Sequence, residues 1–267
     1  MDGPARTAKA IERRPAAACA RLRAIVLIPA RLASKRLPNK ALLPIAGKPL
    51  IAHVVERGLE AGLGPVHVAT DSQEIAARAR ALGVDATLTC REHACGSDRL
   101  GEALTTIDPD GRYEAIVNLQ GDLPFLPLGA LAAALSLLED EAVDIGTLAT
   151  LAAPEEEASP DAPKIVGTLI APRRMRAHYF SRARVPFGEG PIYRHLGVYA
   201  FRRRALQRFV SLPVSLLEAR EGLEQLRALE DGMRIDAALL DTAPVSVDTM
   251  DDLRGLRETT NDSGGKA

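Results

Sequence analysis

Residues 25–42 read IVLIPARLASKRLPNKAL, an apolar run that breaks at Pro29 and continues into a strongly basic segment. A continuous run of branched apolar residues is typical of a strand that is buried on both faces of a sheet. Four cations follow within ten residues before the chain becomes apolar again, namely Arg31, Lys35, Arg36 and Lys40. The sequence therefore places concentrated positive charge at the carboxyl end of its first predicted strand.

The residues up to about 152 alternate predicted strands with predicted helices. Further strands are predicted over 65–71, 85–90, 113–122 and 144–152. Helices are predicted over 49–62, 72–83, 97–107 and 128–140. Such alternation indicates βαβ units, so we predict an α/β fold with a Rossmann-like, mostly parallel sheet. In these sheets ligands bind beyond the carboxyl ends of the strands.

The pattern changes after the polar, proline-rich stretch 154–163, which we predict to be a loop. Between about 164 and 200, strands follow one another without long helices, so we expect an antiparallel extension. A protruding set of strands needs burial, so we expect this extension to be a dimer contact and the protein to be a homodimer. Helices over 202–211 and 215–231, strands over 234–241 and 243–249, and a closing helix from Met250 complete the prediction.

Composition excludes several classes of protein. Of the 267 residues, 46% are hydrophobic and 26% charged, with a net charge of -1, which indicates a globular chain and no nucleic-acid partner. No run of about 18 apolar residues exists, so we predict no membrane span. The three cysteines form no CxxC pair, which favours a reducing, cytoplasmic location and no structural zinc.

The chain divides unevenly by charge. Residues 1–24 carry six cations and two anions without an apolar stripe, so we predict a disordered basic leader. We predict a single domain over 25–258 and a flexible tail over 259–267.

The basic loop after the first strand is a candidate phosphate site. Neither a P-loop nor a G-x-G-x-x-G motif is present, so side chains must do the binding. Arg36 can bind phosphate oxygens bidentately and Lys40 can act as a point charge. On charge alone, a solvated basic loop explains the segment equally well.

Two carboxylates add a candidate metal site. Asp122 ends the segment LQGD after a predicted strand, and Asp248 precedes the closing helix in VDTMDDL. Each alone fits a turn or a helix start. Together with the basic loop they suggest Mg²⁺ bridging a nucleoside triphosphate, because hard cations prefer oxygen ligands.

A set of motifs carries a resemblance to one known family. They are IPARLASKRLPNKAL, VATD, HACGSDRL, VNLQGDLP, YFSRARVPF, RHLGVYAF, LEAREGLEQLRAL and VDTMDDL. The set resembles the 3-deoxy-manno-octulosonate cytidylyltransferase (CMP-Kdo synthetase) family, whose fold is of the nucleotidyltransferase type. The resemblance implies an Mg²⁺-dependent enzyme that converts CTP and 3-deoxy-D-manno-octulosonate (Kdo) to CMP-Kdo and pyrophosphate, activating Kdo for lipopolysaccharide synthesis.

The resemblance also implies roles for individual residues. Catalysis would fall to Arg36, Lys40, Asp122 and Asp248, and the two aspartates would bind the metal. The implied nucleotide-binding residues are Ala30, Arg31, Arg36, Lys40, Ala69, Thr70, Asp71, Gly96, Ser97, Arg99 and Gln120. The implied sugar-binding residues are Gln120, Arg182, His195, Tyr199, Glu224 and Gln225. Arg182 would face the sugar carboxylate.

Two alternatives stay open on the sequence. The substrate could be a related acidic sugar, such as 8-amino-Kdo or a sialic acid, or the chain could be a non-catalytic nucleotide-binding regulator on the same fold. Cys95 is not expected to be a nucleophile, because no histidine is evidently paired with it.

Overall fold

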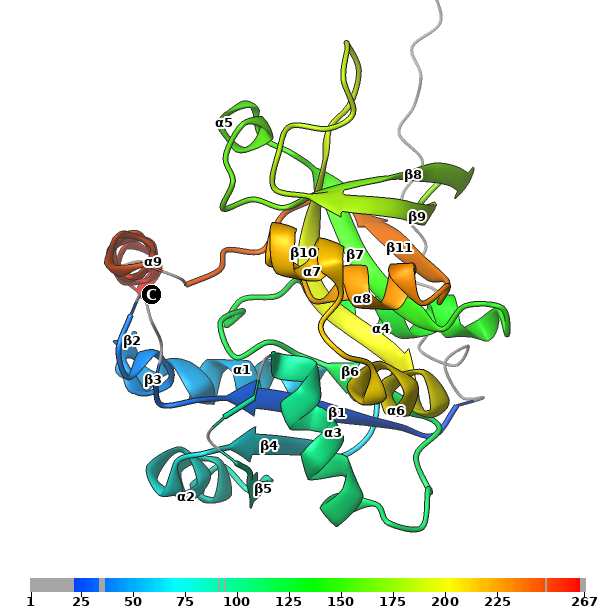
Figure 1. Cartoon of the computed structure of the whole chain (residues 1–267). Helices are drawn as coiled ribbons and strands as arrows, with labels where there is room; N and C mark the ends of the chain where they lie inside the picture. The colour runs from blue at the N-terminus through cyan, green and yellow to red at the C-terminus, as the bar shows by residue number, and fades with distance from the viewer. Residues whose placement is uncertain (1–21, 34–36, 91, 94, 248, 265–267) are drawn as a thin grey trace, which may run out of the picture.

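The computed structural model describes residues 22–33, 37–90, 92–93, 95–247 and 249–264, the last six by backbone only (Figure 1). Arg36, Asp248 and nearly all of the predicted leader lie outside these residues. No helix in this described part of the chain is long and apolar enough to cross a membrane.

One mixed sheet organises the chain. Its nine strands lie in the order β5-β4-β1-β6-β10-β7-β11-β9-β8. The first four are β5 (Asp85–Leu88), β4 (Val66–Thr70), β1 (Ala24–Ala30) and β6 (Ala115–Asn118). The others are β10 (Tyr193–Arg202), β7 (Ile145–Leu151), β11 (Ile235–Leu240), β9 (Arg174–Ser181) and β8 (Lys164–Ala171). A two-stranded hairpin, β2 (Pro44–Ile45) and β3 (Lys48–Pro49), stands apart.

Helices cover both faces of the sheet. One face carries α1 (Leu50–Glu60), α2 (Gln73–Ala81), α4 (Ala130–Ser136) and the 3₁₀ turn η3 (Leu137–Glu139). The near face in Figure 1 carries α3 (Gly96–Ile107), α6 (Arg203–Ser211), α7 (Leu216–Glu221) and α8 (Gln225–Glu230). The short elements η2 (Lys40–Leu42) and α5 (Pro154–Glu157) and the closing helix α9 (Met250–Gly264) complete the fold.

The alternation of side chains along β1 explains why two cores form. Val26 and Ile28 pack into the core under α1 and α4, whereas Ile25 and Leu27 pack into the core under α3 and α6. All four side chains are buried because side chains alternate between the faces of a strand and both faces are covered. The predicted reading of this stretch as a doubly buried strand is confirmed.

The sheet is less parallel than the sequence predicted. β4, β1 and β6 pair in parallel, as do β4 with β5 and β7 with β11. Within the described part of the nine-stranded sheet, each antiparallel pairing involves β9 or β10. The antiparallel segment is present as expected, but β10 is inserted between β6 and β7 and is not appended at the edge.

Three local predictions need correction. The helix expected over 215–231 is two helices, because Gly222 adopts a left-handed conformation (φ +64°) that ends α7. The strand expected over 243–249 is absent from its described residues, 243–247 and 249. The loop expected over 154–163 contains α5, whose first turn begins with Pro154, a favoured first helical residue.

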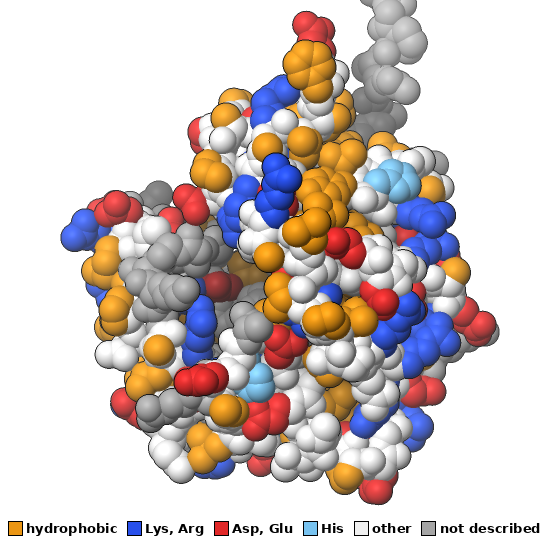
Figure 2. Space-filling model, in the orientation of Figure 1, with side chains coloured by type: hydrophobic (Ala, Val, Ile, Leu, Met, Phe, Trp, Pro, Cys, Tyr) orange, Lys and Arg blue, Asp and Glu red, His pale blue; other side chains and the backbone are white. Residues whose placement is uncertain are grey.

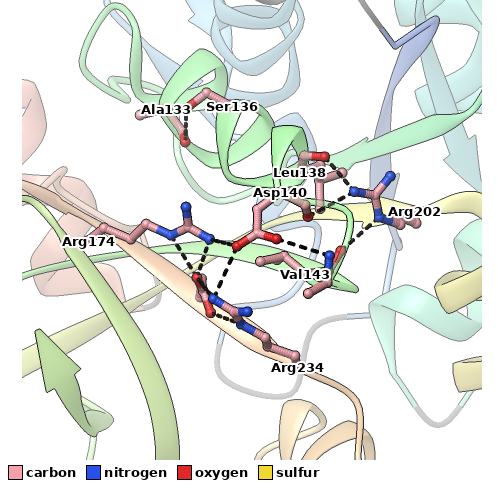
Figure 3. A network of polar contacts seen from close by, with 10 residues as sticks. Ala133, Ser136, Leu138, Asp140, Val143, Arg174, Arg202 and Arg234 are labelled. Carbon is pink, nitrogen blue, oxygen red and sulfur yellow. Dashed lines mark hydrogen bonds and ion pairs between the residues drawn. The ribbon is translucent and has the colours of Figure 1, made fainter. Parts of the chain in front are cut away.

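An Arg–Asp network closes the edge of the sheet where β7 and β11 begin (Figure 3). Asp236 is fully buried and accepts hydrogen bonds from Arg174 (2.7 Å) and Arg234 (3.0 Å). Asp140 also accepts from Arg174 at 2.8 Å, and Arg202 donates to the carbonyls of Leu138 and Val143. We call these residues the closed network.

Candidate active site

The carboxyl ends of three adjacent parallel strands meet at one edge of the sheet. β4, β1 and β6 lie side by side, so the segments that follow them emerge together. Gly121 packs closely on β1, since a Cβ built on it would lie only 2.9 Å from the Pro29 carbonyl oxygen. The glycine of LQGD thereby allows Gln120 and Asp122 to lie against the end of β1.

Asp71 and Arg99 fix the loop that leaves β1. Asp71 Oδ1 accepts a hydrogen bond from the Leu32 backbone N–H at 3.0 Å. The Arg99 guanidinium lies 4.0 Å from Asp71 and donates to Thr89 and to the Cys90 carbonyl. Both side chains are buried, so they fix the backbone at Leu32, where the loop begins. Ala30, Ala69 and Thr70 are buried residues at the carboxyl ends of β1 and β4.

Lys40 and Asp122 form an ion pair at the centre of this edge. Lys40 Nζ lies 3.0 Å from Asp122 Oδ2, although the two residues are 82 positions apart. Asn39, in a left-handed conformation, precedes the turn η2 and brings Lys40 back toward the sheet. Asp122 stays 29% exposed, so its carboxylate is accessible from solvent.

The chain that leads to Asp248 also reaches this edge. The Val247 backbone N–H donates to the Asp122 carbonyl at 3.0 Å. Thr249 caps α9, because its hydroxyl accepts from the Asp252 N–H (3.2 Å). Asp248 and Arg36, two of the four expected catalytic residues, lie outside the described residues, whereas Arg31 is exposed at the end of β1.

Three of the expected sugar-binding residues form a buried polar cluster. His195 Nε2 lies 2.9 Å from Thr147 Oγ1, and His195 Nδ1 lies 3.4 Å from Gln225 Nε2. The Tyr199 hydroxyl donates to Gln225 Oε1 at 3.1 Å. Burial, reinforced by the charge of Arg194, lowers the pKa of His195 to about 3, so the ring is neutral near pH 7.

Glu224 joins this cluster to the first turn of α3. Its Oε2 accepts from the Ser97 backbone N–H at 3.4 Å. Burial raises the pKa of Glu224 despite hydrogen bonds from Cys95 and Ser97. Burial and Glu224 in turn raise the pKa of the Cys95 thiol, which agrees with the expectation that it is not a nucleophile.

Gln120 lies between the two groups of expected site residues. A Cβ built on Gly96 would lie 3.6 Å from the Gln120 amide, and one built on Gly197 would lie 3.8 Å from Gln120 Cγ. The side chain therefore reaches the start of α3 and the bulge in β10, as a residue with roles toward both ligands would.

Arg182 is held by backbone carbonyls. Its guanidinium donates to the carbonyl oxygens of Glu221 (2.8 Å), Pro160 (2.7 Å) and Gly222 (3.3 Å). The Glu221 carboxylate accepts from the Arg182 backbone N–H and from Ser181. Carbonyls orient the guanidinium without neutralising its charge, which leaves the charge available to an anion.

Sequence reasoning missed three residues that build the site. Thr147 orients His195, Glu221 positions Arg182, and Arg227 joins α8 to α3. Glu221 and Arg227 lie inside the quoted motif LEAREGLEQLRAL. Its charged residues spaced three and four apart on short helices were a usable signal, whereas Thr147 gave none in its apolar strand.

The described surface is hollowed beside this edge. Figure 2 shows a recess left of the centre of this view, bordered by both basic and acidic side chains. The described residues contain no group of three or more His, Cys, Asp or Glu side chains that could hold a metal by themselves. Asp122 alone fits Mg²⁺, which commonly binds one or two carboxylates together with substrate phosphates. In the structure this carboxylate pairs with the Lys40 ammonium.

The fold and this edge define a nucleotidyltransferase enzyme, and the cytidylyltransferase family model matches residues 25–235. A 3-deoxy-manno-octulosonate cytidylyltransferase of Methylobacterium nodulans is 56% identical over 234 residues, covering 87% of this chain and 95% of the relative. One of Rhodopseudomonas palustris is 55% identical over the same share of this chain. The chain belongs to the 3-deoxy-manno-octulosonate cytidylyltransferase family.

Solved structures agree with this assignment. A structure of CMP:2-keto-3-deoxy-manno-octonic acid synthetase complexed with CTP superposes with a TM-score of 0.82 at 35% identity, covering 90% of this chain and 99% of that chain. UDP-glucose pyrophosphorylase complexed with UDP-glucose gives a TM-score of 0.64 at 14% identity, with 91% of this chain covered. The latter likeness concerns the fold alone.

Proposed function

We propose that the protein transfers the cytidylyl group of CTP to Kdo, releasing pyrophosphate, and so supplies activated Kdo for lipopolysaccharide synthesis in the cytoplasm. The anomeric hydroxyl of the sugar attacks the α-phosphate, the bond to the pyrophosphate breaks, and the hydroxyl proton is lost to solvent. The observation that carries the proposal is the Lys40–Asp122 pair at the shared edge of β1 and β6, next to the buried His195–Gln225–Tyr199 cluster.

Cations near the carboxyl end of β1 bind the triphosphate in this proposal. Lys40 and Arg31, with Arg36 from the same loop, offset the negative charge that grows on the departing pyrophosphate. Such a site accelerates transfer mainly by positioning and charge neutralisation. The anchored Leu32 backbone supports this role, because it fixes the start of the loop before any ligand arrives.

Asp122 and Asp248 would hold Mg²⁺. When bound, the ion would lower the pKa of the attacking hydroxyl and screen the phosphates. With a pKa of about 3, the His195 ring is neutral near pH 7 and is a weak base. This supports a mechanism without a histidine acid or base, in which the ring contributes hydrogen bonds. Gln225 and Tyr199 hold that ring, and Arg182 pairs with the sugar carboxylate.

Pyrophosphate release tests the proposal directly. Purified protein is mixed with each of the four nucleoside triphosphates and with Kdo, 8-amino-Kdo or a sialic acid, with and without excess EDTA. We expect release with CTP and Kdo that EDTA abolishes and Mg²⁺ restores. Release only with another acid would replace the substrate, and CTP binding without release with any acid would favour a regulator.

We also propose a homodimer formed through the β8–β9 edge. β8 is the last strand of the sheet and exposes Leu169 and Ile170, and Phe187 is exposed in the loop after β9. Apolar side chains gather on this upper part of the molecule in Figure 2. Light scattering should give twice the chain mass, and Leu169→Glu should shift it toward the monomer; a monomeric wild type would refute the dimer.

A further inference from the structure

Arg227 is a buried cation that joins three elements. Its Nε and Nη2 donate to the two oxygens of Glu218, each at 2.7 Å, as a bidentate pair. Its Nη1 donates to Asp98 Oδ1 at 3.2 Å and reaches the Leu212 carbonyl at 3.5 Å. The guanidinium also lies 4.7 Å from the centre of the Phe209 ring. With 3% of the side chain exposed, this contact set is shielded from solvent.

The two carboxylates that Arg227 binds come from two different helices. Asp98 is in the first turn of α3, beside Ser97 and within the segment expected to contact the nucleotide. Glu218 is in α7, which leads through Gly222 to Glu224 and Gln225 on the sugar side. Arg227 itself lies one short turn beyond these two residues, on α8.

A second contact runs parallel to the first. Ser97 donates its backbone N–H to Glu224, one residue before Asp98 on α3 and three before Arg227 on α8. Two consecutive residues of α3 therefore bind two residues of the α8 segment that share a face. A shift of the first turn of α3 cannot occur without a shift of α8 while both contacts hold.

We propose that Arg227 is a positioning residue that couples the nucleotide side of the site to the sugar side, so that binding of one substrate improves binding of the other. This inference rests on the proposed function. Ordering the start of α3 around a nucleotide fixes Asp98, which through Arg227 fixes α8 with Glu224 and Gln225. The second ligand then meets groups that are already in place, and by linkage the effect is reciprocal.

The coupling can be measured without turnover. Titration calorimetry gives the affinity for Kdo with and without the non-hydrolysable analogue α,β-methylene-CTP, both with Mg²⁺, and the ratio is the coupling factor. We expect Arg227→Lys to reduce this factor at least about fivefold, since a lysine cannot bridge Glu218 bidentately and reach Asp98 together. Asp98→Asn removes the charge from the α3 arm alone and should reduce the factor in the same direction.

Arg208→Lys is the matched control. Arg208 on α6 lies 2.5 Å from Asp231, the residue that caps the far end of α8, and does not bind α3. We expect its coupling factor to stay within about twofold of the wild type. Because Asp98→Asn leaves the Glu218 pair intact, it serves as the test if Arg227→Lys does not fold.

The outcomes separate this inference from the proposed function. Turnover of CTP and Kdo by the wild type tests the function alone; if another acid is the substrate, the coupling is measured with that acid. A wild type with no coupling overturns the role of Arg227. So do variants that lower the melting temperature but keep the wild-type coupling factor, because Arg227 would then only stabilise the fold.

Discussion

The sheet edge that carries Lys40 and Asp122, which we call the active edge, and the closed network both pair basic side chains with aspartates, but they differ in how completely the charges are paired. In the closed network, buried Asp236 has two arginine partners, and Arg174 binds two aspartates (Figure 3). At the active edge, Asp122 has Lys40 beside it and keeps 29% of its side chain exposed. A fully paired cluster fixes strands in place, whereas a solvent-accessible carboxylate can still bind a ligand.

Substitution at the active edge should affect activity without affecting the fold. Asp122→Asn keeps the size of the side chain but removes the charge that would bind the metal. We expect kcat to fall about 10³-fold. Pyrophosphate release measures the loss, and an unchanged melting temperature is the control. Near-normal turnover would remove Asp122 from the metal site.

Substitution in the closed network should do the reverse. Asp236→Asn leaves Arg174 and Arg234 facing a neutral buried group, so we expect about 3 kcal/mol of lost stability in urea unfolding. The neighbouring Arg173–Asp241 pair provides a matched control on the surface, with Asp241 73% exposed. Asp241→Asn should cost about 0.5 kcal/mol or less. Equal costs at both sites would show that the closed network adds nothing.

Lys40→Ala tests the cationic half of the active edge. Losing a charge-assisted contact with phosphate should lower kcat/KM for CTP by about 10- to 100-fold. Lys48, whose ammonium pairs with Glu56 on the surface, is the matched control, and Lys48→Ala should change kcat/KM by about twofold or less. Unchanged CTP kinetics in Lys40→Ala would place the triphosphate elsewhere.

Asp108 is the centre of a second paired cluster, and the pH dependence of stability tests how much such pairing contributes to the fold. Burial raises the pKa of Asp108, but hydrogen bonds from the Tyr113 and Arg112 backbones and from Arg203 outweigh it and bring the pKa to about 2. This folded value lies below the ordinary 3.8, so the carboxylate stabilises the fold above about pH 4, and the contribution is lost as pH falls toward 2.

Urea unfolding of the wild type and Asp108→Asn checks this sign. The difference in stability between the two should shrink by about 2 kcal/mol between about pH 6 and about pH 2. A difference that stays constant over this range would mean that the carboxylate has no depressed pKa in the folded protein.

Much of the secondary structure could be predicted from the sequence, because helix caps and strand patterns depend on residues that are close along the chain. The helix predicted over 72–83 is present as α2, where Ser72 caps the start through the Ile75 N–H and Gly83 follows the end with a φ of +80°. The break at Gly222 was not visible, since the apolar spacing continues across it. The place of β10 between β6 and β7 depends on pairing between distant strands, which no local pattern contains.

The same limit applies to the site. Lys40 and Asp122 were both expected in the site, and the structure brings their charged atoms within 3.0 Å of each other, while their roles toward phosphate and metal stay predictions. The joint placing of His195, Tyr199 and Gln225 also follows the resemblance. Thr147 and the bridging role of Arg227 could not be predicted, because each depends on which strands and helices become neighbours in space.

The contact between Val247 and Asp122 has a consequence for how the molecule is made. A chain leaves the ribosome amino end first, so β1, β4 and β6 can pair long before Val247 emerges. Arg257, on the final helix, likewise binds the Pro44 carbonyl just beyond the Lys40 turn. These contacts can therefore form only after the rest of the fold has been synthesised, so the turn that carries Lys40 and the segment that carries Asp122 gain their last supports when the closing helix docks.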